Sequence, residues 1–312
     1  MAAEQTAITS GLPVSGRTRV VGVFGWPVAH SLSPSMHNAA FRHLGLDFIY
    51  VAFPVAPAHL PEALRGIRAL DLVGVNLTIP HKEAALPHLD TLAPEVELIG
   101  AANTVHHEDG CLVGYNTDAR GFTAALQEAR FTAAGARGVL VGAGGAARAA
   151  LWELARGGAR AITLLNRTPS RAQALAEAVA RQFPGVAVEV RPLRGPGRAQ
   201  ALAGADLLVN ATPAGMAHEP PLDLPLEALP DSCLVCDLVY TPPETPLLRA
   251  ARDRGLRTCD GLGMLVHQGA LSFGIWTKQP APVPVMRRAL LETLAGTATG
   301  LRLTASRHLG DN

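Results

Sequence analysis

The chain has 312 residues, of which 48% are hydrophobic and 17% charged, so it can bury a large core and is unlike an intrinsically disordered protein. Its 27 basic residues nearly balance its 26 acidic ones, which excludes the strongly basic surface typical of a nucleic-acid-binding protein. Four cysteines are too few for a disulfide framework in a chain of this length. No apolar run approaches the roughly 18 residues of a membrane span. The first residues contain Glu4 and lack the apolar core of a secretory signal. We therefore expect a cytoplasmic globular protein with no membrane or nucleic-acid partner.

Short apolar runs alternate along the chain with Ala- and Leu-rich stretches of helical length. The expected strands lie at 18–25, 47–55, 72–79, 139–143, 161–165, 206–211 and 232–239. The stretches expected to form helices include 34–44, 57–70, 119–130, 145–157 and 169–182. Continuous apolar strands separated by helices are typical of a mostly parallel sheet that is covered on both faces, so the pattern predicts the α/β class.

Residues 103–115 interrupt this alternation with two short strands around Asp109-Gly110, a pair that favours a two-residue hairpin turn. A hairpin inside a series of βαβ units is a plausible end of a domain, so we expect a boundary near residue 117. Residues 184–204 contain several Gly and Pro and predict a short strand with loops. The first 17 residues and residues 301–312 have weak periodicity and are expected to be flexible.

The segment 139–155 predicts a dinucleotide-binding turn. Gly142, Gly144 and Ala147 occupy the G-x-G-x-x-G/A positions between an expected strand and an expected helix. Gly142 allows the tight turn, Gly144 lets the backbone approach a pyrophosphate, and Ala147 lets helix and strand pack closely. The alternative is a helix start rich in Ala and Gly that only packs tightly on a sheet.

The end of the next strand indicates which dinucleotide would bind. An NAD site usually places a carboxylate there, whereas this strand ends in Asn166-Arg167-Thr168. A guanidinium and a hydroxyl can bind a 2′-phosphate, which a carboxylate would repel. The sequence therefore predicts NADP, unless Arg167 is an ordinary surface arginine.

Polar side chains near the ends of the first and third strands are candidates for substrate binding. Ser31 and Ser33 lie near a helix start and could bind a carboxylate, although Ser33 followed by Pro34 is equally a good helix cap. Asn76 and Thr78 are expected on one face of the third strand, followed by Lys82. Taken alone, Lys82 could be a solvated surface lysine, and Asp118 could simply cap helix 119–130.

Taken together, these segments resemble the shikimate dehydrogenase family. Matching blocks run in the family's order from about residue 22 to 278. The blocks are His30-Ser31-Leu32-Ser33-Pro34 with Met36-His37-Asn38, Gly74 to Lys82, Gly100 to Val105, Asn116-Thr117-Asp118, Gly142 to Ala146, Asn166-Arg167-Thr168, Asn210-Ala211-Thr212, Asp237 to Tyr240, and Gly261 to Val266 with Gln268. Each block is a weak motif, and only the ordered set is specific.

The resemblance implies reversible reduction of 3-dehydroshikimate to shikimate with NADPH, with Lys82 as the acid/base group paired with Asp118. It implies that the substrate is bound by Ser31, Ser33 and Tyr240 at its carboxylate and by Thr78, Asn103, Asp118 and Gln268 at its ring hydroxyls. It assigns the pyrophosphate to Gly142, Ala143, Gly144, Gly145 and Ala146, the 2′-phosphate end to Asn166, Arg167, Thr168 and Arg171, and the nicotinamide to Thr212, Leu238 and Gly261. No metal is expected.

The resemblance also implies two domains. Residues 18–117 and 261–300 would form a substrate-binding domain, because the family's C-terminal helices return to it, and residues 118–260 would form a Rossmann-like NADP-binding domain. The chain departs from many relatives at Ala119, where they carry glycine, and from some at Leu238, where they carry methionine. The oligomeric state, monomer or homodimer, stays open.

Two other functions remain possible at this stage. A quinate or quinate/shikimate dehydrogenase would share the fold, but several quinate-using relatives carry threonine where this chain has Ser33, and one methyl group is a small difference. A non-catalytic NADP-binding sensor would not need Lys82 together with Asp118. A metal enzyme is not indicated, because Cys233 and Cys236 lie three residues apart in an expected strand and His106-His107 are expected at the surface.

Overall fold

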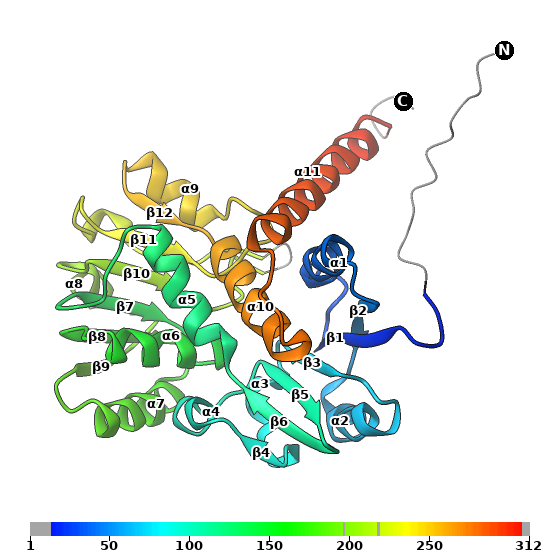
Figure 1. Cartoon of the computed structure of the whole chain (residues 1–312). Coiled ribbons are helices and arrows are strands. Elements are labelled where there is room, and N and C mark those ends of the chain that lie inside the picture. Colours follow the sequence, from blue (N-terminus) through cyan, green and yellow to red (C-terminus); the bar gives the residue numbers. More distant parts are fainter. Residues whose placement is uncertain (1–13, 196, 217–218, 308–312) are drawn as a thin grey trace.

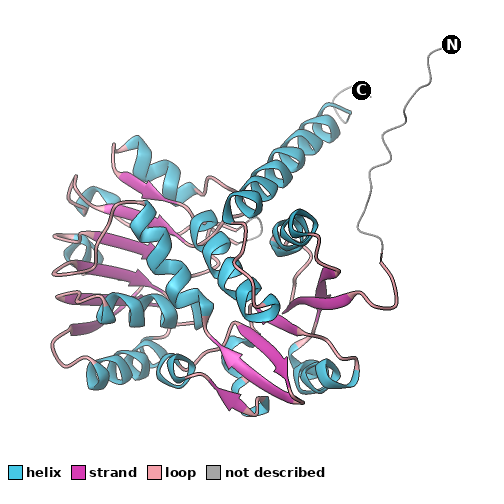
Figure 2. Cartoon of the chain, viewed as in Figure 1, coloured by secondary structure: helices cyan, strands magenta, loops and turns pink. Residues whose placement is uncertain are grey.

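The computed structural model describes residues 14–195, 197–216 and 219–307, and within them the strands form two separate sheets of six strands each (Figure 1, Figure 2). The first sheet has the order β2-β1-β3-β5-β6-β4 and the second β12-β11-β10-β7-β8-β9. Helices cover both sheets, so the predicted α/β class is confirmed.

The first sheet mixes parallel strands with a hairpin. Its strands are β1 (Arg19–Gly25), β2 (Phe48–Pro54), β3 (Gly74–Leu77), β4 (Thr91–Leu92), β5 (Thr104–Glu108) and β6 (Cys111–Tyr115). Strand β1 pairs in parallel with β2 and β3, whereas β5 runs antiparallel to β3 and to β6. Asp109 and Gly110 turn the hairpin with φ of 51° and 79°. Two positive φ values match the turn that this residue pair favours, so the predicted hairpin is confirmed.

Short helices connect these strands. They are α1 (Ser33–Leu44), η1 (Pro57–His59), α2 (Leu60–Ala69), α3 (His81–Ala84), η2 (Leu86–His88) and α4 (Pro94–Ile99). On one face of the sheet, Leu64 and Ile67 of α2 pack in a cluster with Val75. On the other face, Phe41 of α1 packs in a cluster with Val23.

The second sheet is entirely parallel. Its strands are β7 (Arg137–Val141), β8 (Ala161–Asn166), β9 (Ala187–Pro192), β10 (Leu207–Asn210), β11 (Leu234–Asp237) and β12 (Arg257–Cys259). Its helices are α5 (Thr117–Glu128), α6 (Gly145–Arg156), α7 (Pro169–Gln182), α8 (Arg198–Leu202), η3 (Leu226–Ala228) and α9 (Pro246–Asp253). Because the strand order reverses between β7 and β10, the carboxyl ends of these two strands form the crevice where open α/β sheets bind ligands.

The last two helices join the second sheet back to the first. Helix α10 (Gly261–Thr277) lies beside α5, and α11 (Val283–Arg307) lies beside α1 before it extends away from the body of the molecule (Figure 1). Phe273 and Trp276 of α10 and Met286 of α11 are buried in the cluster that covers the first sheet. The C-terminal segment therefore packs where the family resemblance implies.

Some local expectations differ from the structure. Ser33 does not cap α1, because the cap position is Leu32 and no side chain caps the helix. Asn116, not Asp118, caps α5: its Oδ1 accepts a hydrogen bond from the Ala119 N–H, because Asn116 is the extended residue and Asp118 already lies in the first turn. Residues 184–204 contain α8 in addition to the expected strand β9.

His106 is buried, so the expectation that it lies at the surface is wrong. It lies on β5, which is an inner strand between β3 and β6, and its Nδ1 is 3.0 Å from the Val73 carbonyl oxygen. Flexible termini are expected at residues 1–17 and 301–312. Of these, residues 1–13 and 308–312 lie outside the described part of the chain, and residues 301–307 belong to α11.

Candidate active site

Helix α3, which follows β3, contacts the start of α6 and so joins the first sheet's segment to the glycine-rich turn of the second. An alanine Cβ at Gly145 would lie 2.9 Å from both Cβ and Cδ of Lys82, so the lysine stem packs directly on the glycine-rich turn. The Lys82 carbonyl accepts a hydrogen bond of 2.8 Å from the Ala102 N–H. Residues 82, 102 and 145 thus lie together where segments of the two sheets meet.

Lys82 forms an ion pair with Asp118. The distance from Lys82 Nζ to Asp118 Oδ2 is 2.5 Å, and only 17% of the lysine side chain and 5% of the aspartate side chain are exposed. Strand β3 ends at Leu77 and Pro80 directly precedes α3, which presents Lys82 towards the start of α5, where Asp118 lies in the first turn. The predicted catalytic pair is therefore together in the structure, and it is largely shielded from water.

Asn103 connects Asp118 to the C-terminal helix α10. Its Nδ2 lies 2.9 Å from Asp118 Oδ1 and 3.2 Å from Gln268 Oε1, and its Oδ1 accepts a hydrogen bond of 2.7 Å from the Thr117 N–H. Gln268 in turn donates to the Leu265 carbonyl oxygen at 2.8 Å. Three of the predicted substrate-binding residues, from three different segments, are thus held by one hydrogen-bond network.

The predicted carboxylate-binding residues lie together at the start of α1. Ser31 Oγ accepts a hydrogen bond of 3.3 Å from the Ser33 N–H, and the Ser31 hydroxyl is near enough to Tyr240 to lower the pKa of that tyrosine against the larger effect of burial. Burial raises the pKa of Tyr240 to about 12, so its hydroxyl stays neutral and can donate. Thr78 is half-buried, and its methyl group packs against Gly25. A Cβ added to Gly25 would lie only 2.3 Å from Thr78 Cγ2.

The glycine-rich turn has the shape that a dinucleotide requires. Gly142 has φ of 115°, and a Cβ there would lie 3.1 Å from the Ala211 carbonyl oxygen and from Thr212 Cγ2. A Cβ at Gly144 would meet no atom within 4 Å, so the space above the turn is open. No side chain caps α6, and its first N–H groups are available to an anion. The turn therefore fits a pyrophosphate.

The other predicted cofactor residues lie at the carboxyl ends of neighbouring strands. Asn166 ends β8 and donates to the Thr168 carbonyl oxygen at 2.9 Å, while Arg167 and Thr168 are exposed. Next to β10, Thr212 Oγ1 donates to Asn210 Oδ1 at 2.7 Å. Leu238 and Gly261 are in contact, since a Cβ on Gly261 would be 2.5 Å from the Leu238 carbonyl oxygen.

Three family models match separate segments of the chain, and known proteins match most of its length. Residues 23–105 match the shikimate dehydrogenase substrate binding domain, residues 125–218 match shikimate / quinate 5-dehydrogenase, and residues 261–291 match the shikimate 5′-dehydrogenase C-terminal domain. The chain is 49% identical to shikimate dehydrogenase (NADP(+)) of Methanopyrus kandleri, an alignment that covers 90% of this chain and 98% of the relative. The chain belongs to the shikimate dehydrogenase family.

Solved structures of the family superimpose on most of the chain. A crystal structure of a shikimate dehydrogenase in complex with NADP+ gives a TM-score of 0.83 at 42% identity and covers 91% of this chain and 98% of that one. The Thermus thermophilus enzyme in complex with NADP(H) and shikimate gives 0.78 at 41% identity and covers 88% and 99%. The two-sheet arrangement is thus the fold of this family.

Sequence reasoning missed a buried hydrogen-bond network next to the predicted substrate-binding residues. The Tyr50 hydroxyl donates to Asn76 Oδ1 at 2.8 Å, and Asn76 Nδ2 lies 3.0 Å from both Thr104 Oγ1 and Ser272 Oγ. Burial raises the pKa of Tyr50 well above its ordinary value, and the nearby Ser33 hydroxyl offsets part of that rise. A tyrosine in a buried strand usually has a hydrogen-bond partner for its hydroxyl, so Tyr50 in an expected strand could have predicted a buried polar network.

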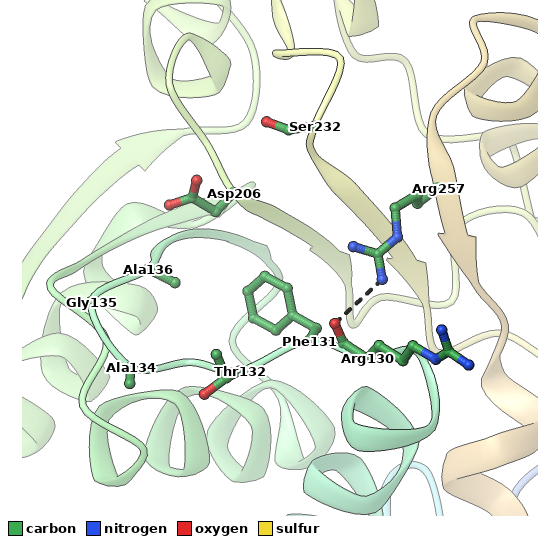
Figure 3. Close-up of a pocket in the computed structure, with 9 residues that line it drawn as sticks. All are labelled: Arg130, Phe131, Thr132, Ala134, Gly135, Ala136, Asp206, Ser232 and Arg257. Carbon is green, nitrogen blue, oxygen red and sulfur yellow. Dashed lines mark hydrogen bonds between the residues drawn. The ribbon is translucent and has the colours of Figure 1, made fainter.

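A hollow of about 400 Å³ lies away from this site, at the other end of the second sheet (Figure 3). Asp206, Ser232 and Arg257, at or just before the amino ends of their strands, line it together with Phe131. The Arg257 guanidinium lies 3.4 Å from the Arg130 carbonyl oxygen. None of the predicted site residues lines this hollow, so it is separate from the candidate active site.

Among the described residues, no helix is both long and apolar enough to cross a membrane. In the same part of the chain, no group of three His, Cys, Asp or Glu side chains is placed to hold a metal ion.

Proposed function

We propose that the chain is an NADP-dependent shikimate dehydrogenase, which reversibly reduces 3-dehydroshikimate to shikimate in the biosynthesis of aromatic amino acids. The observation that carries this function is the shielded ion pair between Lys82 and Asp118, in contact with the glycine-rich turn at Gly145. A proton-transfer group beside a dinucleotide site is the arrangement that reduction of a ketone to an alcohol requires.

Bound NADPH supplies the hydride. The Lys82 ammonium donates a proton to the ketone oxygen, which becomes the new hydroxyl, and in the reverse direction the neutral amine takes the proton back. Asp118 holds the Lys82 ammonium through Oδ2, and its other oxygen is held by Asn103. Because that carboxylate is hydrogen-bonded on both sides, it aims Nζ at one position above the glycine-rich turn.

The substrate would be oriented by polar groups at its two ends. We assign the substrate carboxylate to the hydroxyls of Ser31, Ser33 and Tyr240, which lie at the start of α1 as neutral donors. We assign the ring hydroxyls to Thr78, Asn103, Asp118 and Gln268. The hydrogen bonds from Asn103 to Asp118 and to Gln268 support this assignment, because they hold these three side chains in place before a substrate binds.

The cofactor would lie along the carboxyl ends of the second sheet. We assign its pyrophosphate to residues 142–146, its 2′-phosphate to Asn166, Arg167, Thr168 and Arg171, and its nicotinamide to Thr212, Leu238 and Gly261. The open space over Gly144 and the exposed Arg167 support these assignments. The same proposal divides the chain into a substrate-binding domain, 18–117 with 261–300, and an NADP-binding domain, 118–260.

The proposal includes a cytoplasmic monomer or homodimer with no nucleic-acid partner. The four cysteines are free, and this supports a reducing compartment such as the cytoplasm. The nearly balanced charge supports the absence of a nucleic-acid partner.

The test is to measure initial rates of the purified protein on shikimate and on quinate, each with NADP+ and with NAD+. We expect a strong preference for shikimate with NADP+. Comparable turnover of quinate with NAD+ would instead assign the chain to the quinate dehydrogenases, and NADP+ binding without any turnover would make it a non-catalytic binding protein.

A further inference from the structure

Glu83, the residue after Lys82, forms ion pairs with two arginines from the second sheet's helices. Glu83 Oε1 accepts a hydrogen bond of 2.6 Å from Arg171 Nη2 on α7, and Glu83 Oε2 lies 3.2 Å from Arg148 Nε on α6. Helix α3 therefore carries the acid/base lysine and, next to it, a carboxylate that reaches across to the cofactor side.

Arg171 is also part of the segment assigned to the 2′-phosphate. Its N–H donates to the Thr168 carbonyl oxygen at 3.1 Å, so it lies in the first turn after Asn166-Arg167-Thr168. Its side chain is 55% exposed, and Arg148, by contrast, is 21% exposed and lies 3.5 Å from the Ile99 carbonyl oxygen. Arg171 is thus the more exposed of the two partners, and its guanidinium is accessible to a second anion besides Glu83.

We propose that Glu83 limits the preference for NADP over NAD by competing with the 2′-phosphate for Arg171, an inference that rests on the proposed function. A phosphate carries between one and two negative charges at neutral pH and binds a guanidinium more strongly than a single carboxylate does. NADP draws Arg171 away from Glu83, which keeps Arg148, whereas NAD has no 2′-phosphate and leaves the Glu83–Arg171 pair intact. Glu83 therefore reduces the amount by which the 2′-phosphate makes NADP bind more tightly than NAD.

The test compares two probes that differ only in that phosphate, adenosine 2′,5′-bisphosphate and adenosine 5′-monophosphate, by calorimetric titration of the full chain. We expect Glu83→Gln to bind the bisphosphate about two- to five-fold more tightly, the range of an exposed ion pair, and the monophosphate with unchanged affinity. Glu62→Gln is the matched control, since Glu62 is an exposed glutamate paired with Arg65 on α2 and its loss changes net charge equally. This control should bind both probes like the unmodified chain.

A double-mutant cycle shows whether Glu83 acts through Arg171 or only through its charge. In an Arg171→Gln background, Glu83→Gln should change neither affinity, because there is no guanidinium to compete for. A tightening that persists in that background, or no tightening in Glu83→Gln itself, overturns the proposal. Glu83→Asp keeps the charge but shortens the reach, and it should show a smaller tightening of the bisphosphate.

These outcomes separate the inference from the proposed function. An unmodified chain that prefers the bisphosphate, with no effect of Glu83→Gln, overturns the role of Glu83 and leaves the NADP assignment standing. An unmodified chain that binds both probes equally overturns the NADP assignment and this inference together.

Discussion

The substrate side of the site is buried and hydrogen-bonded, whereas the cofactor side is open to solvent. Asn103, Asp118 and Gln268 are each less than a tenth exposed, and Asn103 is hydrogen-bonded to both of the others. Arg167 and Thr168 are exposed, and the space above Gly144 is empty of protein atoms. The folded chain itself therefore sets the substrate geometry, and the cofactor side offers groups that a ligand must bring together.

This difference predicts that substitutions on the two sides of the site have different effects on the enzyme. Changes on the substrate side should lower the reaction rate or the free energy of unfolding, because they disturb a finished network. Changes on the cofactor side should mainly alter the affinity for the dinucleotide. Helix α3 is where the two sides touch, so its residues give the sharpest tests.

The largest effect is expected for Lys82→Met. Methionine keeps an apolar stem to pack on Gly145 but has no proton to give, so kcat should fall about 10²- to 10⁴-fold, the usual contribution of general acid–base catalysis. Initial rates and fluorescence titration of NADPH measure the two quantities, and NADPH affinity should change little. Lys278→Met, which removes an exposed lysine paired with Glu108, is the matched control and should keep full kcat. A full-rate Lys82→Met enzyme would show that another group moves the proton.

The sequence predicts the two sides of the site to different extents, for physical reasons. The glycine-rich turn is local, so the spacing of Gly142 and Gly144 was enough to predict it without any tertiary information. Asn103, Asp118 and Gln268 come from segments up to 165 residues apart, and their grouping followed only from the family resemblance. The pair between Glu83 and Arg171, 88 residues apart, has no local signal at all.

The errors have the same origin. Asp118 and Asn116 are both good capping residues, and only the backbone conformation at Asn116 decides which one caps α5. His106 was expected at the surface because it follows a hairpin pattern, but its burial depends on β3 pairing with β5, a contact between distant strands. Contacts between distant segments of the chain cannot be predicted from the spacing of residues within one segment.

The second effect concerns His37, which lies beneath the substrate side. It is fully buried, its ring stacks on Tyr50 with centroids 4.4 Å apart, and neither ring nitrogen has a hydrogen-bond partner within the protein. Burial lowers the pKa of His37 to about 3, from 6.5 in the unfolded chain. Only the neutral form is accommodated, so its contribution to stability is complete above pH 6.5 and is lost as the pH falls from 6.5 towards 3.

Urea unfolding at pH 7 and pH 5 measures this loss. Over the 1.5 pH units below 6.5, His37 should remove about 2 kcal/mol from the free energy of unfolding, at 1.36 kcal/mol per unit. His37→Phe keeps an aromatic ring in the stack but cannot take a proton, so its stability should fall by about 2 kcal/mol less over the same interval. Equal losses in both proteins would mean that His37 does not titrate in this range.

The smallest effect, and the one that tests the comparison most directly, comes from two neighbouring glycines. An added Cβ at Gly145 would be 2.9 Å from Lys82 Cβ, an atom fixed to the backbone, so Gly145→Ala must shift α3 and draw Nζ away from Asp118. We expect kcat to fall about ten-fold with little change in NADPH affinity, since a small misplacement of a reacting group lowers the rate.

Gly144→Ala meets no protein atom, so it leaves Lys82 in place, but its methyl group occupies the open space assigned to the pyrophosphate. That variant should bind both NADPH and NADH about ten-fold more weakly at nearly unchanged kcat. If both alanines weakened only cofactor binding, the contact between α3 and α6 would not position the lysine, and the substrate side would be independent of the turn it touches.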